Sequence, residues 1–116
     1  MIQRGDIVLV ELDPAVRPEQ SKTRPAIVVS NNASADSAER RGRGVITVVP
    51  LTSNVRSVYP FQVLLRPAES GLPIESKAQA EQVRSVSTTR VVRTVGRVTA
   101  ERMAALDDAL RLHLSL

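Results

Sequence analysis

The chain has 116 residues, of which 42% are hydrophobic and 24% are charged, with a formal net charge of +4. These values are typical of one small folded domain, and we expect residues 1–116 to form a single domain. The absence of cysteine and the presence of one histidine, one Tyr and one Phe exclude a disulfide framework, a thiol nucleophile, a multi-histidine metal site and a broad platform for base stacking.

The first half of the chain predicts three strands. Ile7–Leu12 is short and rich in β-branched residues, and an Asp-Pro pair ends it. After a polar loop, Pro25 begins a second strand over Ala26–Val29, and Val45–Leu51 forms the third. Residues 33–44 are rich in Ala, Ser, Glu and Arg, and we expect a loop there with at most one helical turn.

The second half predicts three more strands and several turns. Tyr59–Leu65 alternates apolar and polar residues, and residues 66–75 contain two prolines and a glycine, as in a turn or loop. Ser76–Val86 reads as a more polar fifth strand, Ser87–Arg90 as a short helical turn, and Arg93–Val98 as the last strand. The alternation of the fifth strand places Ala78, Ala80 and Gln82 on one face and Gln79, Glu81 and Val83 on the other.

A terminal helix follows, and Thr99 is expected to cap it. Met103, Leu106, Leu110 and Leu114 recur at helical spacing, so we expect one stripe of the helix to pack on the sheet as core or as a dimer contact. The fold class is therefore mainly β with a C-terminal helix (α+β), built as a small, strongly bent antiparallel sheet or barrel.

Three ring side chains receive structural interpretations. We expect Tyr59 and Phe61 in the core, and His113 on the helix surface or at the periphery of a dimer. The chain opens with charged residues and its purest apolar runs are four residues long, as in Ala26–Val29. This pattern predicts neither a signal peptide nor a membrane helix, and we expect the protein in the cytoplasm.

Basic charge is concentrated in two stretches without acidic residues. Residues 40–66 carry five Arg, and residues 82–98 carry four. If strands from these stretches are neighbours, they form a basic face that suits a polyanion. Charged edge strands that prevent aggregation are the alternative, and the excess of Arg over Lys is equally explained by a GC-rich genome.

Several segments match a known pattern in order along nearly the whole chain. They are Arg4-Gly5-Asp6-Ile7 at the start of the first strand, Pro18–Ser30 (PEQSKTRPAIVVS), Val49-Pro50-Leu51-Thr52-Ser53, Tyr59–Val63 (YPFQV), Lys77–Ser85 (KAQAEQVRS) and Gly96-Arg97-Val98. Together they resemble the MazF/PemK/Kid family of toxin endoribonucleases, and its mycobacterial members in particular. The succession of segments is more specific than any one of them.

The resemblance implies an SH3-like antiparallel barrel of the MazF/CcdB type and a homodimer. It also implies sequence-specific cleavage of single-stranded RNA without metal or other cofactor, as an mRNA interferase that inhibits translation and growth. The partners it implies are single-stranded RNA and a cognate MazE-like antitoxin, whose tail covers the RNA site.

The resemblance makes Arg24 the leading catalytic residue and Thr52 the second. RNA can be cut when its own 2′-OH attacks the adjacent phosphate, which requires a base, donors for the phosphorane and an acid for the 5′-oxygen. A guanidinium and a hydroxyl suit the last two requirements, and Glu19 is the candidate base or loop organiser. The ordinary structural alternatives are a surface ion pair for Arg24, a backbone contact for Thr52 and a solvated side chain for Glu19.

The predicted RNA-binding residues are polar side chains around these three. Glu81 and Gln82 match an Asp-Gln pair of the family, with Glu in place of Asp, and Gln79 stands where one branch has Arg. These departures leave the acid–base assignment open, because the site can depend more on Arg24 or Arg84. The full set is Gln20, Lys22, Ser53, Asn54, Gln79, Glu81, Gln82 and Arg84.

Two other functions remain open at this stage. One is a CcdB-like toxin of the same barrel class that poisons DNA gyrase by protein contact without cleaving RNA, since one fold hosts both activities. The weaker one is a non-toxic RNA-binding domain. Arg24-Pro25 together with Thr52 favours cleavage, because a gyrase poison does not need these residues.

Overall fold

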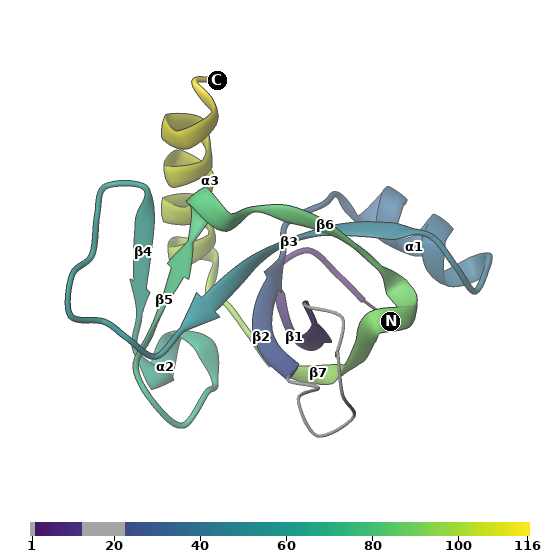
Figure 1. Cartoon of the computed structure of the whole chain (residues 1–116), viewed down its shortest axis with the longest axis horizontal. Helices are drawn as coiled ribbons and strands as arrows, with labels where there is room; N and C mark the ends of the chain where they lie inside the picture. Colours follow the sequence, from purple (N-terminus) through teal and green to yellow (C-terminus); the bar gives the residue numbers. More distant parts are fainter. Residues whose placement is uncertain (1, 13–22) are drawn as a thin grey trace.

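A bent antiparallel sheet with a C-terminal helix against it makes up most of the chain (Figure 1). The computed structural model describes residues 2–12 and 23–116. The strands are hydrogen-bonded in the order β4-β5-β3-β2-β1-β7, and β6 pairs with β3, which confirms the predicted class. The strands are β1 (Asp6–Glu11), β2 (Thr23–Val28), β3 (Val45–Thr52), β4 (Gln62–Leu65), β5 (Ser76–Gln79), β6 (Arg84–Ser87) and β7 (Val91–Arg97), and the helices are α1 (Asn32–Arg40), α2 (Pro67–Ser70), η2 (Ala80–Gln82), η3 (Thr88–Arg90) and α3 (Ala100–Leu114).

Strand β3 is the centre of the sheet because three strands pair with it. β2 occupies one edge, and the other edge is shared by β6 along Val45–Val48 and by β5 along Leu51–Thr52. The single strand predicted over Ser76–Val86 is therefore wrong, since η2 divides it into β5 and β6. β5 and β6 both pair with the same edge of β3. For this reason the sequence Ser76–Val86 has the polarity pattern of a single strand.

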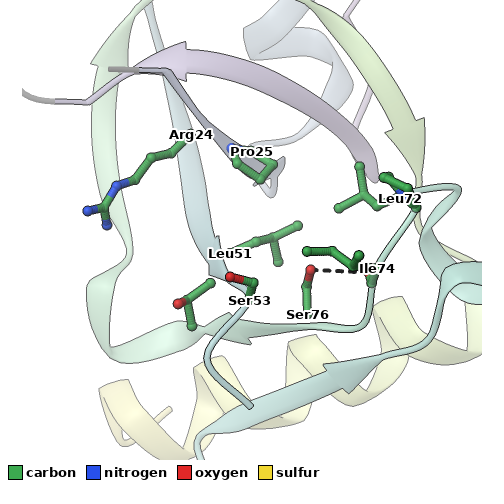
Figure 2. A pocket seen from close by; sticks show the side chains of 9 residues that line it. Arg24, Pro25, Leu51, Ser53, Leu72, Ile74 and Ser76 are labelled. Carbon is green, nitrogen blue, oxygen red and sulfur yellow. Dashed lines mark hydrogen bonds between the residues drawn. The ribbon is translucent and has the colours of Figure 1, made fainter. Parts of the chain in front are cut away.

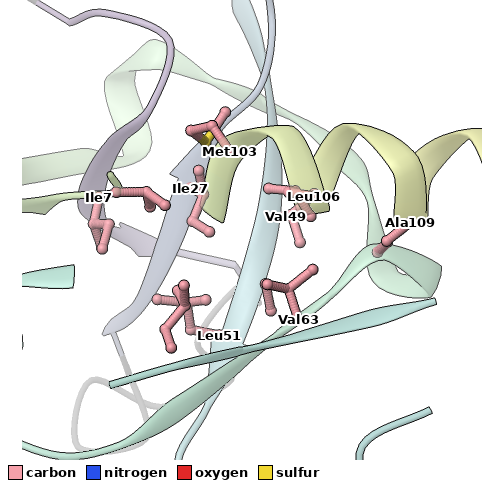
Figure 3. Close-up of a cluster of buried hydrophobic side chains, with 12 residues drawn as sticks. Ile7, Ile27, Val49, Leu51, Val63, Met103, Leu106 and Ala109 are labelled. Carbon is pink, nitrogen blue, oxygen red and sulfur yellow. The ribbon is translucent and has the colours of Figure 1, made fainter. Parts of the chain in front are cut away.

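The strand centres are apolar on both faces because each face is buried in its own core. Ile7 faces one cluster and its neighbour Val8 faces the other, both with no exposed surface. The first cluster lies between the sheet and α3 (Figure 3). Its buried members are Ile7, Ile27, Val49, Leu51, Val63, Leu65, Ala78, Ala80, Val98, Met103, Leu106 and Ala109, and those of the second are Val8, Val10, Leu12, Ala26, Val28, Ala35, Ile46, Val48 and Val86.

Helix α3 confirms the predicted cap and most of the predicted stripe. The Thr99 side chain accepts a hydrogen bond from the backbone N–H of Arg102, and Met103 and Leu106 are buried. Leu110 is partly buried against the same cluster, whereas Leu114 is 48% exposed and lies outside this core, so a dimer contact is the prediction that remains for it. Figure 1 shows the reason, because the last turns of α3 extend beyond the strands.

The segment predicted as a loop over residues 33–44 contains the nine-residue helix α1. Asn31 caps this helix by accepting from the backbone N–H of Ser34 at 2.8 Å, and Ala35 and Ala38 are its buried residues. Because alanine is small, the apolar face of α1 is inconspicuous in the sequence. The short helix α2 lies in the predicted turn region, and η3 confirms the predicted helical turn.

The two aromatic residues lie outside the core. Tyr59 is 54% exposed and Phe61 is half-buried, so their predicted core positions are wrong. The reason is that β4 begins at Gln62 and leaves both rings in the loop before it, where they stack with centroids 5.5 Å apart. His113 is exposed as predicted and lies 6.4 Å from the Phe61 ring. Within residues 2–12 and 23–116, no helix has both the length and the apolar character needed to span a membrane.

Candidate active site

A pocket of about 460 Å³ brings Arg24 and Thr52 together, as Figure 2 shows from close by. Arg24 is the second residue of β2 and Thr52 the last residue of β3, so the start of one strand and the end of its neighbour meet here. We call this the Arg24–Thr52 pocket. Its lining consists of Arg24, Pro25, Leu51, Thr52, Ser53, Leu72, Pro73, Ile74 and Ser76.

The backbone of Arg24 is fixed by sheet pairing while its side chain is exposed. Arg24 pairs with Val10 of β1, and the next residue, Pro25, pairs with Leu9. In Figure 2 the guanidinium extends away from Leu72 and Ile74 on the far side of the pocket. A fixed strand and a solvent-facing guanidinium suit contact with an anionic ligand, because the planar fork binds phosphate oxygens in pairs.

The Thr52 hydroxyl is oriented by the backbone that follows it. Its Oγ1 accepts a hydrogen bond from the backbone N–H of Asn54 at 3.2 Å. A hydroxyl that accepts one bond still has its proton to donate. Thr52 can therefore present an O–H donor at the rim of the pocket, and the exposed Ser53 beside it lines the same pocket.

The opposite wall of this pocket is apolar and was missed by sequence reasoning. Leu72, Pro73 and Ile74 form it, and Ile74 is 57% exposed. Ser76 at the start of β5 supports the wall, because its Oγ donates to the carbonyl oxygen of Ile74 at 3.5 Å. The signal that could have revealed this wall is a Leu-Pro-Ile run inside an otherwise polar turn segment.

A second, more polar pocket of about 240 Å³ is also lined by Arg24. We call it the Gln79–Gln82 pocket. The predicted strand alternation placed these two glutamines on opposite faces, which is wrong because η2 rotates the chain between them. Its lining residues are Leu12, Arg24, Pro50, Gln79, Gln82 and Arg84.

The other predicted site residues lie apart from these two pockets. The Glu81 carboxylate accepts a hydrogen bond from Nε2 of Gln62 at 2.7 Å, and its Oε1 is buried without a partner among the described residues. Asn54 is exposed, and its Oδ1 accepts from the backbone N–H of Arg56 at 3.3 Å. The predicted catalytic Glu19 and the predicted RNA contacts Gln20 and Lys22 lie outside the described residues.

The two basic stretches are neighbours in the sheet, since β3 of the first pairs with β6 of the second. Their arginines are spread over several environments. Arg97 pairs with Asp6 at 2.6 Å, Arg90 donates to the Glu11 carbonyl oxygen at 3.3 Å, and Arg84 lines the Gln79–Gln82 pocket with Arg24. Among the described residues that line the two pockets, the basic side chains are Arg24 and Arg84.

The chain is similar to proteins named endoribonucleases over its whole length. It is 56% identical over 116 residues to endoribonuclease MazF9 of Mycobacterium tuberculosis, covering 100% of this chain and 98% of that protein. It is 26% identical over 117 residues to endoribonuclease EndoA of Bacillus subtilis, covering 100% and 97%.

Solved structures of similar fold include toxins crystallised with their antitoxins. A mycobacterial endoribonuclease in complex with its cognate antitoxin matches with a TM-score of 0.76 at 23% identity, over 100% of this chain and 97% of that chain. A MazE–MazF structure from Deinococcus radiodurans matches with a TM-score of 0.76 at 26% identity, over 99% and 96%. The family model for the PemK-like, MazF-like toxin of type II toxin–antitoxin systems matches residues 3–114, and the chain therefore belongs to this toxin family.

Proposed function

We propose that this chain is a sequence-specific endoribonuclease that cleaves single-stranded RNA without a metal, as the cytoplasmic toxin of a type II toxin–antitoxin pair. The observation that carries the proposal is the convergence of Arg24 and Thr52 on one pocket, in a chain that is 56% identical to a named endoribonuclease. Membership of the MazF-like family favours this function over the gyrase-poisoning alternative.

The proposed reaction uses the RNA's own 2′-OH as nucleophile. Its oxygen forms a bond to the adjacent phosphorus, the bond from phosphorus to the 5′-oxygen breaks, and the products end in a 2′,3′-cyclic phosphate and a 5′-hydroxyl. Arg24 stabilises the charge that develops on the phosphorane oxygens, and the Thr52 hydroxyl donates a hydrogen bond to one of them or to the leaving oxygen. Glu19 remains the proposed acceptor of the 2′-OH proton, and a water molecule supplies the proton that the leaving 5′-oxygen gains.

The Gln79–Gln82 pocket is proposed to hold a base next to the cleaved phosphate. Glutamine amides both donate and accept hydrogen bonds, as needed to read base edges in single-stranded RNA. Arg24 lines both pockets, so a nucleotide bound in the polar pocket has its phosphate beside the catalytic guanidinium. Ser53, Asn54 and Arg84 remain proposed RNA contacts, and Glu81 is better placed to orient Gln62.

A cognate MazE-like antitoxin is the proposed protein partner, and a homodimer the proposed assembly. The similar structures from the mycobacterial species and from D. radiodurans contain an antitoxin beside the toxin. The exposed Ile74 wall shares one pocket with Arg24, and Arg24 shares the second pocket with Arg84, an arrangement that suits a segment with both apolar and acidic side chains.

The proposal is tested by incubating the purified protein with a long single-stranded RNA in EDTA. We expect discrete cuts that leave 5′-hydroxyl ends, and a loss of about 10²- to 10³-fold in rate for Arg24→Ala and for Thr52→Val. Arg111→Ala and Thr94→Val remove the same groups from exposed positions away from the pockets, and should cleave like the wild type. An RNA that stays intact with the wild-type protein refutes the nuclease function, and a gyrase assay then tests the alternative.

A further inference from the structure

Strand β5 carries a buried lysine beside the candidate catalytic threonine. Lys77 is 8% exposed and pairs directly with Thr52 on one side and with Leu64 on the other. Directly paired residues of an antiparallel sheet present their side chains on the same face, so Lys77 and Thr52 are neighbours there. Lysine is rarely buried because its charge is costly to remove from water, and its position therefore needs a specific partner.

The partner of Lys77 is the loop between β3 and β4, residues 53–61, which we call the β3–β4 loop. The Lys77 ammonium donates a hydrogen bond to the carbonyl oxygen of Ser57 and lies 5.9 Å from the centroid of the Tyr59 ring. A cation over an aromatic ring is attracted by the electron-rich face. Lys77 thus attaches the middle of the loop to the sheet by two different contacts.

Gln62 provides a second attachment at the end of the same loop. This side chain is also 8% exposed, and its Oε1 accepts from the backbone N–H of Tyr59 at 3.1 Å. Its Nε2 donates to Glu81 of η2 at 2.7 Å, which fixes the orientation of the amide. Lys77 and Gln62 therefore attach neighbouring positions of the loop to β5, β4 and η2.

The loop has little apolar burial of its own to set its position. Its side chains at Ser53, Asn54, Arg56, Ser57 and Val58 are all exposed. Without a core beneath it, the loop depends on polar contacts such as those from Lys77 and Gln62 to adopt one arrangement. The loop also begins immediately after Thr52, and its first residue, Ser53, lines the Arg24–Thr52 pocket.

We propose that Lys77 is a positioning residue that fixes the β3–β4 loop and thereby determines which RNA sequence is cut. The inference rests on the proposed RNA cleavage. Displacement of a site group by about 1 Å can cost roughly 100-fold in rate, so a loop that moves Ser53 and Asn54 alters both rate and base preference. Lys77 itself acts through the loop and need not touch the RNA.

The decisive variant is Lys77→Met, which keeps the length of the side chain and removes the ammonium. Lys77→Arg is the conservative variant, because it retains a cation that can donate to Ser57 and lie over Tyr59. Arg111→Met is the matched control, since it removes one exposed positive charge from α3, away from the loop. Thermal unfolding of each variant shows that it is folded.

Each protein is incubated with a pool of long single-stranded RNAs in EDTA, and the new 5′ ends are sequenced. Lys77→Met is expected to cut a broader set of sequences and to lose about tenfold in kcat/KM at the preferred wild-type sequence. Lys77→Arg and Arg111→Met are expected to keep the wild-type preference. A merely stabilising lysine would lower the Tm of Lys77→Met and leave the set of cut sequences unchanged, and that result overturns the inference.

Hydrogen exchange separates this inference from the proposed nuclease function. Amides of residues 53–61 should exchange faster in Lys77→Met than in the wild type, whether or not RNA is cut, and equal exchange refutes the attachment of the loop. Wild-type protein that cuts no RNA refutes the nuclease function and the sequence selection together. If Lys77→Met does not fold, Tyr59→Leu at an exposed position removes the ring contact, and unchanged cut sequences in that variant overturn the inference.

Discussion

Gly96 of β7 lies directly against the carbonyl oxygen of Ser70 at the end of α2, so that a Cβ at Gly96 would come within 2.3 Å of that oxygen. Ser70 is fully buried, and its Oγ accepts the backbone N–H of Leu72 at 3.0 Å. The close approach of Gly96 to Ser70 fixes the position of the segment that leads to Leu72, Pro73 and Ile74, the apolar wall of the Arg24–Thr52 pocket. Glycine is required at residue 96 because the obstructing atom belongs to the backbone.

We therefore predict that Gly96→Ala lowers the free energy of unfolding by about 1–3 kcal/mol, since α2 or β7 must shift to admit the methyl group. Urea unfolding measures this change. Gly42→Ala is the informative comparison, because Gly42 has φ +66° and nothing within 4 Å of its added Cβ. Gly42→Ala should lower the free energy of unfolding by about 1 kcal/mol through backbone strain alone. If it lowers that free energy as much as Gly96→Ala does, or more, the close contact at Gly96 does not matter for stability.

The core beneath α3 gives a second prediction. Leu106 is fully buried in the cluster between helix and sheet, and Leu106→Ala should lower the free energy of unfolding by about 2–5 kcal/mol. Leu114 is 48% exposed, so Leu114→Ala should lower the free energy of unfolding by less than about 1 kcal/mol. Thermal and urea unfolding of the pair measure the difference, and similar losses would mean that the end of α3 is buried in solution.

The contrast between these two leucines shows where sequence reasoning succeeds. Helical spacing identifies the buried stripe from Met103 to Leu110, because periodicity reports which face of a helix is apolar. It does not report where the sheet beneath that helix ends, so it could not separate a core position from an exposed one for Leu114. Similarly, the alternation of Phe61, Val63 and Leu65 predicts a strand over Tyr59–Leu65, but β4 begins only at Gln62.

The candidate site divides in the same way. Arg24, Thr52 and Ser53 are predicted from the resemblance to the toxin family along nearly the whole chain, and the structure places all three in the lining of one pocket. Gln79 and Gln82 line the same pocket because the 3-10 helix η2 lies between β5 and β6. Alternation of polar and apolar residues does not reveal such a turn. The Leu72–Ile74 wall depends on contacts between distant segments, such as that of Ser70 with Gly96.

The polar pocket gives a prediction about base recognition. If Gln82 reads a base edge, Gln82→Leu should reduce the preference at one position of the cut sequence by about two- to tenfold, the equivalent of one hydrogen bond. The cleavage rate averaged over all sequences should change much less. Sequencing of cut ends measures both, with Ser85→Ala at an exposed position of β6 as the control. A preference that persists unchanged would remove Gln82 from the proposed recognition set.

The proposed antitoxin gives a fourth prediction, which concerns charge. Arg24→Glu and Arg84→Glu should each weaken the toxin–antitoxin complex by at least tenfold, because a partner with acidic side chains then meets like charge. The wild-type complex should also weaken as salt rises, since exposed charge pairs are screened. Titration calorimetry measures both effects, and Arg111→Glu on α3 is the control. A complex that is indifferent to both reversals would place the antitoxin elsewhere.

The position of β3 at the centre of the sheet has a consequence for the order of events during synthesis. A ribosome that has just made Thr52 has already made Arg24, but it has not yet made β5 and β6, which share the second edge of β3. That later part of the chain supplies Ser76, which supports the apolar wall, and Lys77, which holds the β3–β4 loop. It also supplies Gln79, Gln82 and Arg84 of the Gln79–Gln82 pocket. Because strand pairing between distant segments must await both partners, the complete cutting site assembles only when most of the chain has left the ribosome. A chain that has reached only Thr52 therefore has the Arg24 and Thr52 side chains but lacks the residues of β5, η2 and β6 that complete the two pockets.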